Sequence, residues 1–461
     1  MELKGLLIVN FLLFLLSIYL IKENSSNFKN AVTLALLIYA YPLLIITQKI
    51  FTQPFLELIY FDGLNIQLKL IIDSASLLFL WLNFLLFLFL YIFIYKNDYQ
   101  NNLFHGLHLL LFIINNFFFI AGDTITFIIF WEAMLIPATL LLYYFSHENQ
   151  RYIALQFLLY NFGFSIFLIL GVLILYSNTE SLDIKALRIF PSGLISFLIF
   201  TGIMVKTPVF PLHGWLLNTY YSLPSPVTAI FSGILSKYSL YALYRFYNET
   251  RLDLKPLLII TTISCIISAL LALRERNLKK IFTFMSMSHL NIMIAGSLGM
   301  LPYTSMNLII PFSFFHGFLA FILFLYVHYL EKLTGELNIE KYGNLTKITP
   351  LFTIFFTLYL LVLAGFPLFA YFYIEFTILS YLFKYSLILG FLLSVAIALN
   401  LVYKSIVFYK LIFIKSVGEA SNKLSDLSFS YIILSSLISL LVIFLTIYFS
   451  PLIHFLAKGG L

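Results

Sequence analysis

Long apolar segments follow one another through nearly the whole chain, separated by short polar stretches. Because a helix needs about 20 mostly apolar residues to cross a bilayer core, this pattern predicts about 14 transmembrane helices. They are expected near residues 5–21, 31–50, 74–95, 103–121, 124–145, 152–176, 192–217, 226–246, 256–273, 280–299, 304–330, 350–383, 386–413 and 430–450. The segments are apolar all round and lack the polar alternation of a membrane β-barrel. We therefore expect an all-α polytopic membrane protein with a single domain, 1–461.

The composition supports a lipid environment. The chain is 62% hydrophobic and 10% charged, whereas soluble domains are about 25% charged. The net charge of +7 does not indicate nucleic acid here, because the basic residues are mostly at span ends and in loops, as interfacial anchoring predicts. Examples are Lys22, Lys29, Lys96, Arg151, Lys185, Arg188, Arg251, Lys279 and Lys280. The first 21 residues lack a clear basic head or cleavage site, so we expect a retained first helix.

Several kinds of chemistry find no support in the sequence. Cys265 is the single cysteine, which excludes a disulfide framework, a thiolate zinc site and an iron–sulfur cluster. Dinucleotide, P-loop, zinc-protease and serine-hydrolase motifs do not occur. The sequence therefore predicts no metal site and no cofactor bound by this chain.

Two of the predicted spans are interrupted. Residues 206–216 (KTPVFPLHGWL) carry Pro208 and Pro211, and residues 363–376 (LAGFPLFAYFYIEF) carry Gly365 and Pro367. Proline removes a backbone donor and breaks a helix. Matched broken helices are typical of transporters built from inverted repeats, although a single kink is common in membrane helices. We expect two inverted five-helix repeats, 103–246 and 256–413, after N-terminal helices (1–100) and before a C-terminal helix (430–450).

Four charged residues lie within apolar segments: Glu132, Lys206, Lys237 and Glu375. Each costs about 2.5–3.5 kcal/mol at a helix centre, so together they cost on the order of 10 kcal/mol unless paired or hydrated. The alternatives to a transport role are a structural ion pair or a side chain that extends to the interface from a helix end. The second alternative is our prediction for Lys404 and Lys410.

These four residues suggest an electrostatic switch for protons. Burial lowers the pKa of a lysine, and a nearby carboxylate reverses that effect. We therefore expect movement of Glu132 relative to Lys206 to control whether the lysine keeps its proton. Lys206 would then pass a proton to Lys237 through water or an intervening histidine.

Histidines on the same segments are candidates for proton relay, because imidazole titrates near neutral pH. We expect His213, His289 and His316 to have this role, whereas His328 fits an ordinary hydrogen-bonded histidine equally well. Haem ligation is the competing use, but the histidines do not recur on paired spans as stacked haems require.

Four motifs together resemble the antiporter-like subunits of respiratory complex I and the related Mrp cation/proton antiporters. They are ExxLIP at 132–137, KTPVFPLHGWL at 206–216, SPVTAIFSGILSKYSLYALYRF at 225–246 and LRERNLKKIFTFMSMSHLN at 273–291. The resemblance extends from about residue 75 to 415. It implies functional roles for Glu132, Lys206, His213 and Lys237, while Arg245 closes the third motif and the fourth motif ends in Ser-His at His289.

The ionisable residue in the second broken helix, Glu375, favours one member of this family. Subunits 2 and 5 of complex I usually have a lysine there, whereas subunit 4 and one Mrp subunit have a glutamate, as at Glu375. The resemblance then implies a proton-translocating subunit of NADH:ubiquinone oxidoreductase. NADH, FMN, iron–sulfur clusters and ubiquinone would be bound by other subunits. Subunits 2 and 5 would be neighbours, and lipids, including cardiolipin, further partners. A sodium/proton antiporter subunit and a membrane scaffold are the alternatives.

The sequence also departs from the family pattern. After Trp215, the segment 216–220 lacks the second histidine that the family usually has. Asn277 replaces a common aspartate, and residues 283–286 (TFMS) replace an Ala-Tyr-Ser-Ser run. The chain contains 52 Phe and 31 Tyr, a composition that fits an A+T-rich organelle genome. We therefore expect an organelle-encoded protein of the mitochondrial inner membrane.

Overall fold

The computed structural model describes residues 2–22, 28–63, 66–94, 101–146, 151–190, 192–248, 253–414 and 420–458. Lys96 and Arg251, expected at span ends, lie outside these residues. The chain divides into two compact units. Unit 1 comprises Met1–Lys206, Tyr241–Asn248 and Pro451–Leu461, and unit 2 comprises Thr207–Leu240 and Glu249–Ser450.

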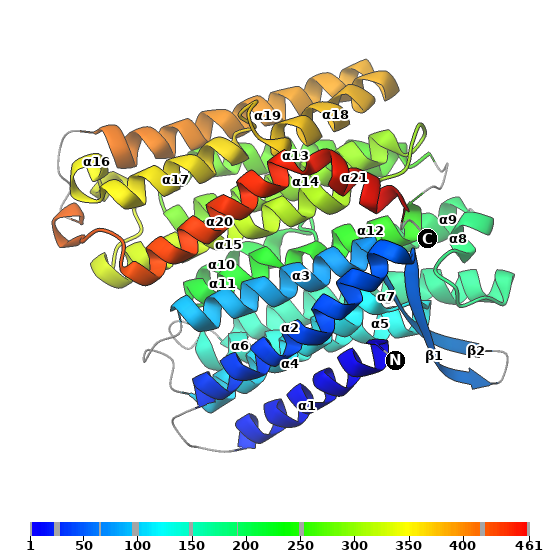
Figure 1. Cartoon of the computed structure of the whole chain (residues 1–461). Helices are drawn as coiled ribbons and strands as arrows, with labels where there is room; N and C mark the ends of the chain where they lie inside the picture. The colour runs from blue at the N-terminus through cyan, green and yellow to red at the C-terminus, as the bar shows by residue number, and fades with distance from the viewer. Residues whose placement is uncertain are drawn as a thin grey trace. The chain divides into compact units, whose positions relative to one another are not determined.

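Unit 1 is built from long and short helices and one β-hairpin (Figure 1). Its helices are α1 (Glu2–Lys22), α2 (Phe28–Thr52), α3 (Ser74–Phe89), α4 (Asn102–Ile120), α5 (Thr124–Ala133), α6 (Leu135–Phe145), α7 (Arg151–Thr179), α8 (Ala186–Ile189) and α9 (Gly193–Met204). The π-helical turn η1 (Leu90–Ile94) extends α3. Unit 1 also contains most of α12 (Tyr238–Tyr247) and of α21 (Phe449–Lys458).

The hairpin is a departure from the predicted all-α chain. Strands β1 (Phe55–Gly63) and β2 (Ile66–Asp73) pair antiparallel, with Phe55 opposite Asp73 and an irregularity between Ile59 and Phe61. The sequence carried a signal for it, since an Asp-Gly pair at Asp62 and Gly63 stands between two runs rich in β-branched and aromatic residues. A search of the hydropathy pattern for spans of about 20 residues does not detect such short strands.

Unit 2 is arranged around two helices that are buried along their whole apolar length. These are α14 (Leu278–Met300) and α15 (Ile309–Thr334). Around them pack α11 (Ser225–Gly233), α13 (Lys255–Arg274), α17 (Pro350–Leu363), α18 (Ala370–Tyr385), α19 (Leu387–Phe408) and α20 (Phe429–Ile447). Figure 1 shows α17 and α18 following one another along α19. The shorter elements are α10 (Gly214–Ser222), η2 (Leu235–Lys237), η3 (Ile339–Lys341), α16 (Leu345–Ile348), η4 (Tyr409–Phe413) and η5 (Ser421–Lys423).

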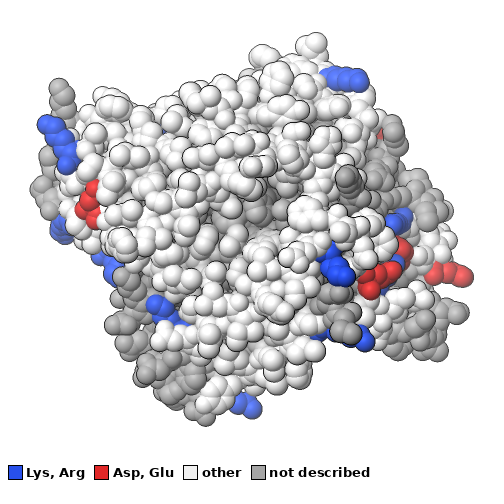
Figure 2. Space-filling model, in the orientation of Figure 1, with Lys and Arg blue, Asp and Glu red and all other residues white. Residues whose placement is uncertain are grey.

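The outer helices expose apolar side chains. On α7 the exposed stripe repeats every three or four residues, which is one face of a helix. Its members are Tyr152, Leu155, Leu159, Phe162, Ile166, Leu170 and Leu173. In Figure 2 most of the visible face is uncharged, and the charged side chains lie mainly toward its margins. Such a surface requires lipid around it.

The helix positions agree with the hydropathy pattern. Among the described residues, 11 helices are long and apolar enough to cross a membrane. The three other predicted spans coincide with pairs of shorter helices: α9 and α10, α11 and α12, and α17 and α18. The multi-spanning helical fold is confirmed, while the count of 14 spans and the inverted repeats stay predictions.

Some breaks in the helices were predicted and others were not. As expected, the chain forms turns over residues 205–213, and α17 ends at Leu363 before Gly365 and Pro367. The spans predicted at 124–145 and 226–246 each contain an interruption that was not predicted. The first breaks at Met134, where Pro137 cannot donate to the carbonyl of Ala133. The second breaks after Gly233 and becomes the 3₁₀ turn η2.

Candidate functional site

Three buried lysines share one structural feature. Each donates a hydrogen bond from Nζ to a backbone carbonyl in the last three residues of an interrupted helix. Lys206 donates to Trp131 near the end of α5, Lys237 to Ser232 near the end of α11 (2.7 Å), and Lys404 to Leu363 at the end of α17. Carbonyls at a helix C-terminus have no partner within the helix and carry the negative end of its dipole. The helix breaks therefore provide cation sites inside apolar segments.

The site of unit 1 joins Lys206 and Glu132. Lys206 is 2% exposed, and its Nζ lies 4.1 Å from the centroid of the Trp131 ring. The charge of Glu132 acts on Lys206. Both carboxylate oxygens of Glu132 are buried and have no hydrogen-bond partner within the described part of the chain. The pairing of Glu132 with Lys206 as a proton switch stays a prediction.

In unit 2, Lys237 contacts a histidine directly. Its Nζ lies 2.8 Å from Nδ1 of His316 and 3.0 Å from Oγ of Ser236, and the lysine is fully buried. The hydroxyl of Ser236 and the ammonium of Lys237 both bond to the carbonyl of Ser232. In a continuous helix this carbonyl would accept from the backbone N–H four residues later. Here side chains donate to it, which accounts for the break at η2.

A second histidine continues the arrangement. The rings of His316 on α15 and His289 on α14 have centroids 5.8 Å apart, and both residues are buried. His289 Nε2 lies 2.8 Å from Lys404 Nζ, and its Nδ1 lies 2.7 Å from the hydroxyl of Tyr371. We call Lys237, His316, His289 and Lys404 the Lys–His line.

Glu375 on α18 lies beside this line. Its Oε1 is 3.8 Å from Nδ1 of His289, and its charge acts on Lys404. The carboxylate occupies the space at Gly365, where a Cβ atom would come within 2.6 Å of Oε2. Gly365 has φ +70, a conformation that glycine adopts without strain. The second helix break, at Gly365, therefore leaves room for the carboxylate of Glu375.

The prediction that Lys404 extends to the membrane interface is wrong. Lys404 is 3% exposed, and it lies nine residues before the end of η4 at Phe413, about 13 Å along a helix axis. Lys410, three residues from that end, is 29% exposed and pairs with Glu340 at 3.3 Å, as an interfacial lysine does. Sequence position alone did not separate the two lysines, because the partners that bury Lys404, His289 and the carbonyl of Leu363, lie far from it in the chain.

Lys279 differs from the sequence-based expectation, and His213 lies outside the Lys–His line. Lys279 was expected at the interface, but it is 1% exposed and donates to the carbonyl of Leu223 at the end of α10. His213 is partly buried in the turn after Pro211, with its ring 5.4 Å from that of Phe210. The hydrogen bonds that form the Lys–His line do not include His213.

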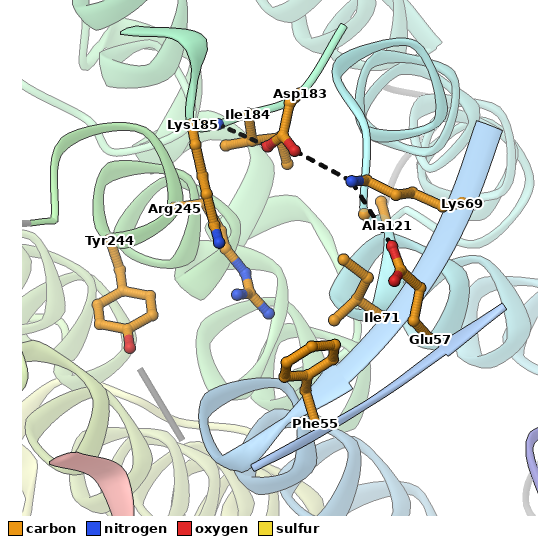
Figure 3. Close-up of a pocket in the computed structure, with 11 residues that line it drawn as sticks. Phe55, Glu57, Lys69, Ile71, Ala121, Asp183, Ile184, Lys185, Tyr244 and Arg245 are labelled. Carbon is orange, nitrogen blue, oxygen red and sulfur yellow. Dashed lines mark hydrogen bonds and ion pairs between the residues drawn. The ribbon is translucent and has the colours of Figure 1, made fainter. Parts of the chain in front are cut away.

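Unit 1 also contains a polar pocket at the hairpin (Figure 3). Its cavity of about 160 Å³ is lined by Glu57, Lys69, Asp183, Lys185 and Arg245, among others, and has room for roughly five waters. Partial burial disfavours the charged form of Lys69, but the hydrogen bond and charge of Asp183 and the charge of Glu57 raise its pKa. Burial likewise opposes ionisation of Asp183, yet the N–H of Lys185 and the ammonium of Lys69 lower its pKa.

Arg245, one of the residues that line this pocket, belongs to a buried ion pair. Nη1 of Arg245 lies 2.6 Å from Oδ2 of Asp73, which is fully buried, and Nη2 bonds to Oδ1. Nε of Arg245 also donates to the hydroxyl of Tyr241. With acids and bases both present on its walls, the pocket shows no preference for an anion, and we assign it no ligand.

The comparisons with known proteins agree with this geometry. The family model described as NADH:quinone oxidoreductase/Mrp antiporter, TM, matches residues 121–400. The chain is 27% identical over 374 residues to F(420)H(2) dehydrogenase subunit M of Methanosarcina mazei, covering 76% of this chain and 74% of the relative. It is 27% identical to NADH-quinone oxidoreductase subunit M of Rickettsia prowazekii, covering 62% and 60%. It is 32% identical to the chloroplastic NAD(P)H-quinone oxidoreductase chain 4 of Ipomoea purpurea, covering 66% and 64%.

Solved structures show the same fold at lower identity. The chain matches one in the Mrp complex from Dietzia sp. with a TM-score of 0.85 and 19% identity, covering 100% of this chain and 97% of that one. It matches one in respiratory complex I from Thermus thermophilus with a TM-score of 0.82 and 20% identity, covering 99% and 100%. The fold is thus common to both kinds of assembly.

Proposed function

The chain belongs to the NADH:quinone oxidoreductase/Mrp antiporter transmembrane family, and we propose that it is a proton-translocating membrane-arm subunit of an NADH:quinone oxidoreductase. Within complex I it would be the antiporter-like subunit of the subunit 4 type. Glu132, Lys206, Lys237 and Glu375 would carry or control the proton, with His289 and His316 as relays. His213 stays a candidate on the family resemblance alone.

The observation that carries this proposal is the Lys–His line. At 2.8 Å, Lys237 and His316 are joined by one hydrogen bond, so the contact between them holds a single proton. The proton belongs to the ammonium in one state and to the imidazole in the other. A change in the surrounding charge moves it, since an opposite charge favours the protonated form of whichever base it approaches.

The relay needs no chemistry other than proton transfer. For each proton that leaves Lys237 for His316, the lysine takes one proton from the opposite side, so charge is conserved. The centroids of the two imidazole rings are 5.8 Å apart, a separation that one water molecule or a ring rotation would bridge. In unit 1, Glu132 would control the proton of Lys206 in the same electrostatic way.

The energy for transport would come from other subunits. Moving one proton against 100 mV requires about 2.3 kcal/mol, and no group in this relay supplies it. We propose that NADH, FMN, iron–sulfur clusters and ubiquinone are bound elsewhere in the complex. Antiporter-like subunits 2 and 5 would be the neighbours, and cardiolipin one of the surrounding lipids.

The membrane in which the chain resides is part of the proposal. Multiple apolar spans make it a multi-pass membrane protein. Its 52 Phe and 31 Tyr favour an organelle genome and hence the mitochondrial inner membrane. The named relatives include bacterial and chloroplast proteins, so the sequence relationship by itself is compatible with several membranes.

A subunit of an Mrp-type sodium/proton antiporter is the second candidate, favoured by the similarity to the Dietzia chain. The names of the curated relatives support the redox complex instead. Purification of the complex in mild detergent separates the two, since an NADH-oxidising flavoprotein co-purifies only with the oxidoreductase.

The experiment that tests the function replaces Lys237 by methionine in the assembled complex. We expect at least about a 10-fold loss of coupled proton transport, with assembly retained. The matched control is Lys280→Met, because Lys280 lies near the surface with its Nζ 4.9 Å from the Tyr221 ring centroid. Normal proton transport in an assembled Lys237→Met complex would refute the proposal.

A further inference from the structure

We propose that Lys404 is a further proton-carrying residue, which exchanges a proton with His289 at one end of the Lys–His line under the control of Glu375. This inference rests on the proposed function and extends it. The sequence motifs assign this end of the line to Glu375 alone, and neither the family resemblance nor the names of the relatives points to Lys404.

The position of Lys404 excludes a role at the membrane interface. It is 3% exposed and surrounded by residues of α14, α17 and α18. Asn400 and Tyr403, on the same stretch of α19, are also buried: Tyr403 donates to Asn400, and Asn400 donates to Ser288. Lys404 therefore faces a polar interior within unit 2.

The contact with His289 has the geometry of a proton-exchanging pair. Lys404 Nζ and His289 Nε2 are 2.8 Å apart, close enough for one hydrogen bond and too close for two protonated cations facing each other. When Lys404 is an ammonium, Nε2 accepts. When His289 carries the proton on Nε2, the lysine is a neutral amine and accepts through its lone pair. One N–H bond breaks as the other forms, and no co-reactant is needed.

The carbonyl of Leu363 holds the amine in both states. In a continuous helix this carbonyl would pair with the N–H of residue 367, but Pro367 has none. Lys404 donates to it instead. Both the ammonium and the neutral amine have an N–H available for this bond. The proton can therefore leave Lys404 without moving Nζ away from His289.

Glu375 provides the control. Its carboxylate lies 3.8 Å from His289 Nδ1 and acts on Lys404, so it stabilises a positive charge on either base. Movement of the carboxylate away from the pair lowers the affinity of both for the proton. The same combination occurs in unit 1, where Lys206 donates to the carbonyl at the end of a broken helix and Glu132 supplies the charge.

The decisive test compares Lys404→Arg with Lys404→Met in the assembled complex. Arginine keeps the charge opposite Glu375 but does not release its proton, whereas methionine removes both functions. We expect both variants to lose coupled proton transport by about 10-fold or more. Lys410→Met, six residues along the same helical segment, is the control and should transport protons normally. Normal transport by Lys404→Arg would overturn the inference, because a fixed counter-charge would then suffice.

A second variant covers the case in which the arginine does not fit. Glu375→Gln combined with Lys404→Met removes both charges and leaves no unpaired ion. We expect this complex to assemble without transporting protons, and proton transport by it would overturn the inference. The Lys237→Met variant separates the two proposals. If Lys237→Met fails to transport while Lys404→Arg transports normally, only the role of Lys404 is refuted.

Discussion

Replacing Gly365 by alanine adds one methyl group and should displace the Glu375 carboxylate that controls the proton shared by Lys404 and His289. The new Cβ would lie 2.6 Å from Glu375 Oε2, whereas ordinary contacts begin at 3.4 Å. The carboxylate must therefore retreat by about 0.8 Å from the site it occupies beside His289. Displacements of about 1 Å cost up to about 100-fold in rate when groups must be aligned, so we expect a 10- to 100-fold loss of proton transport.

The backbone effect of this substitution has a matched control in the same chain. Gly365 and Gly335 both have φ +70, but a Cβ at Gly335 would meet nothing within 4 Å. Alanine in this conformation costs about 1–2 kcal/mol at either site. Both variants should therefore lower the thermal stability of the complex by a similar amount.

The assay is coupled proton uptake in sealed vesicles, measured together with the thermal stability of the complex. We expect Gly365→Ala to lose transport and Gly335→Ala to keep it. Equal transport in the two variants would refute the reasoning, since only the displaced carboxylate of Glu375 distinguishes them.

Three further predictions concern unit 1. Glu132→Gln should reduce coupled proton transport by about 10-fold or more. The complex should still assemble on a native gel, because the carboxylate oxygens make no hydrogen bond that the amide would lose. Failure to assemble would contradict this prediction. Asn83→Leu should lower the melting temperature of the complex, because Asn83 is buried and bonds to Phe112 and Asn116. Hydrogen bonds of this kind within membranes contribute about 0.6–2 kcal/mol, and an unchanged melting temperature would show that they do not stabilise the bundle. The Lys69–Asp183 contact should stabilise the hairpin at neutral pH, and this stabilisation should be lost as the pH falls through the lowered pKa of Asp183. Asp183→Asn should remove this pH dependence in hydrogen exchange of the β2 amides.

Much of the architecture follows from the sequence because lipid imposes a simple rule on it. A run of about 20 apolar residues becomes a helix, so span positions were predictable to within a few residues. Breaks at Pro208, Pro211 and Pro367 were predictable because proline lacks a donor. The break beside Lys237 was not, since there the carbonyl of Ser232 bonds to side chains instead of to the backbone.

The site itself was only partly predictable. Its four charges were visible as ionisable residues in apolar segments, which are costly without a function. Their partners were harder to find, because His289 meets Lys404 across 115 positions of the chain and no local pattern encodes that contact. Lys404 was misassigned for the same reason, because its partners His289 and Leu363 lie far from it in the chain.

The central claim is that protons pass along the Lys–His line, and the ratio of protons translocated to electrons transferred tests it most directly. His289→Gln keeps a polar side chain but removes the titrating ring from the middle of the line. In the assembled complex we predict a lower ratio for His289→Gln, with His328→Gln on α15 as the control at the wild-type value. A wild-type ratio in an assembled His289→Gln complex would contradict the account.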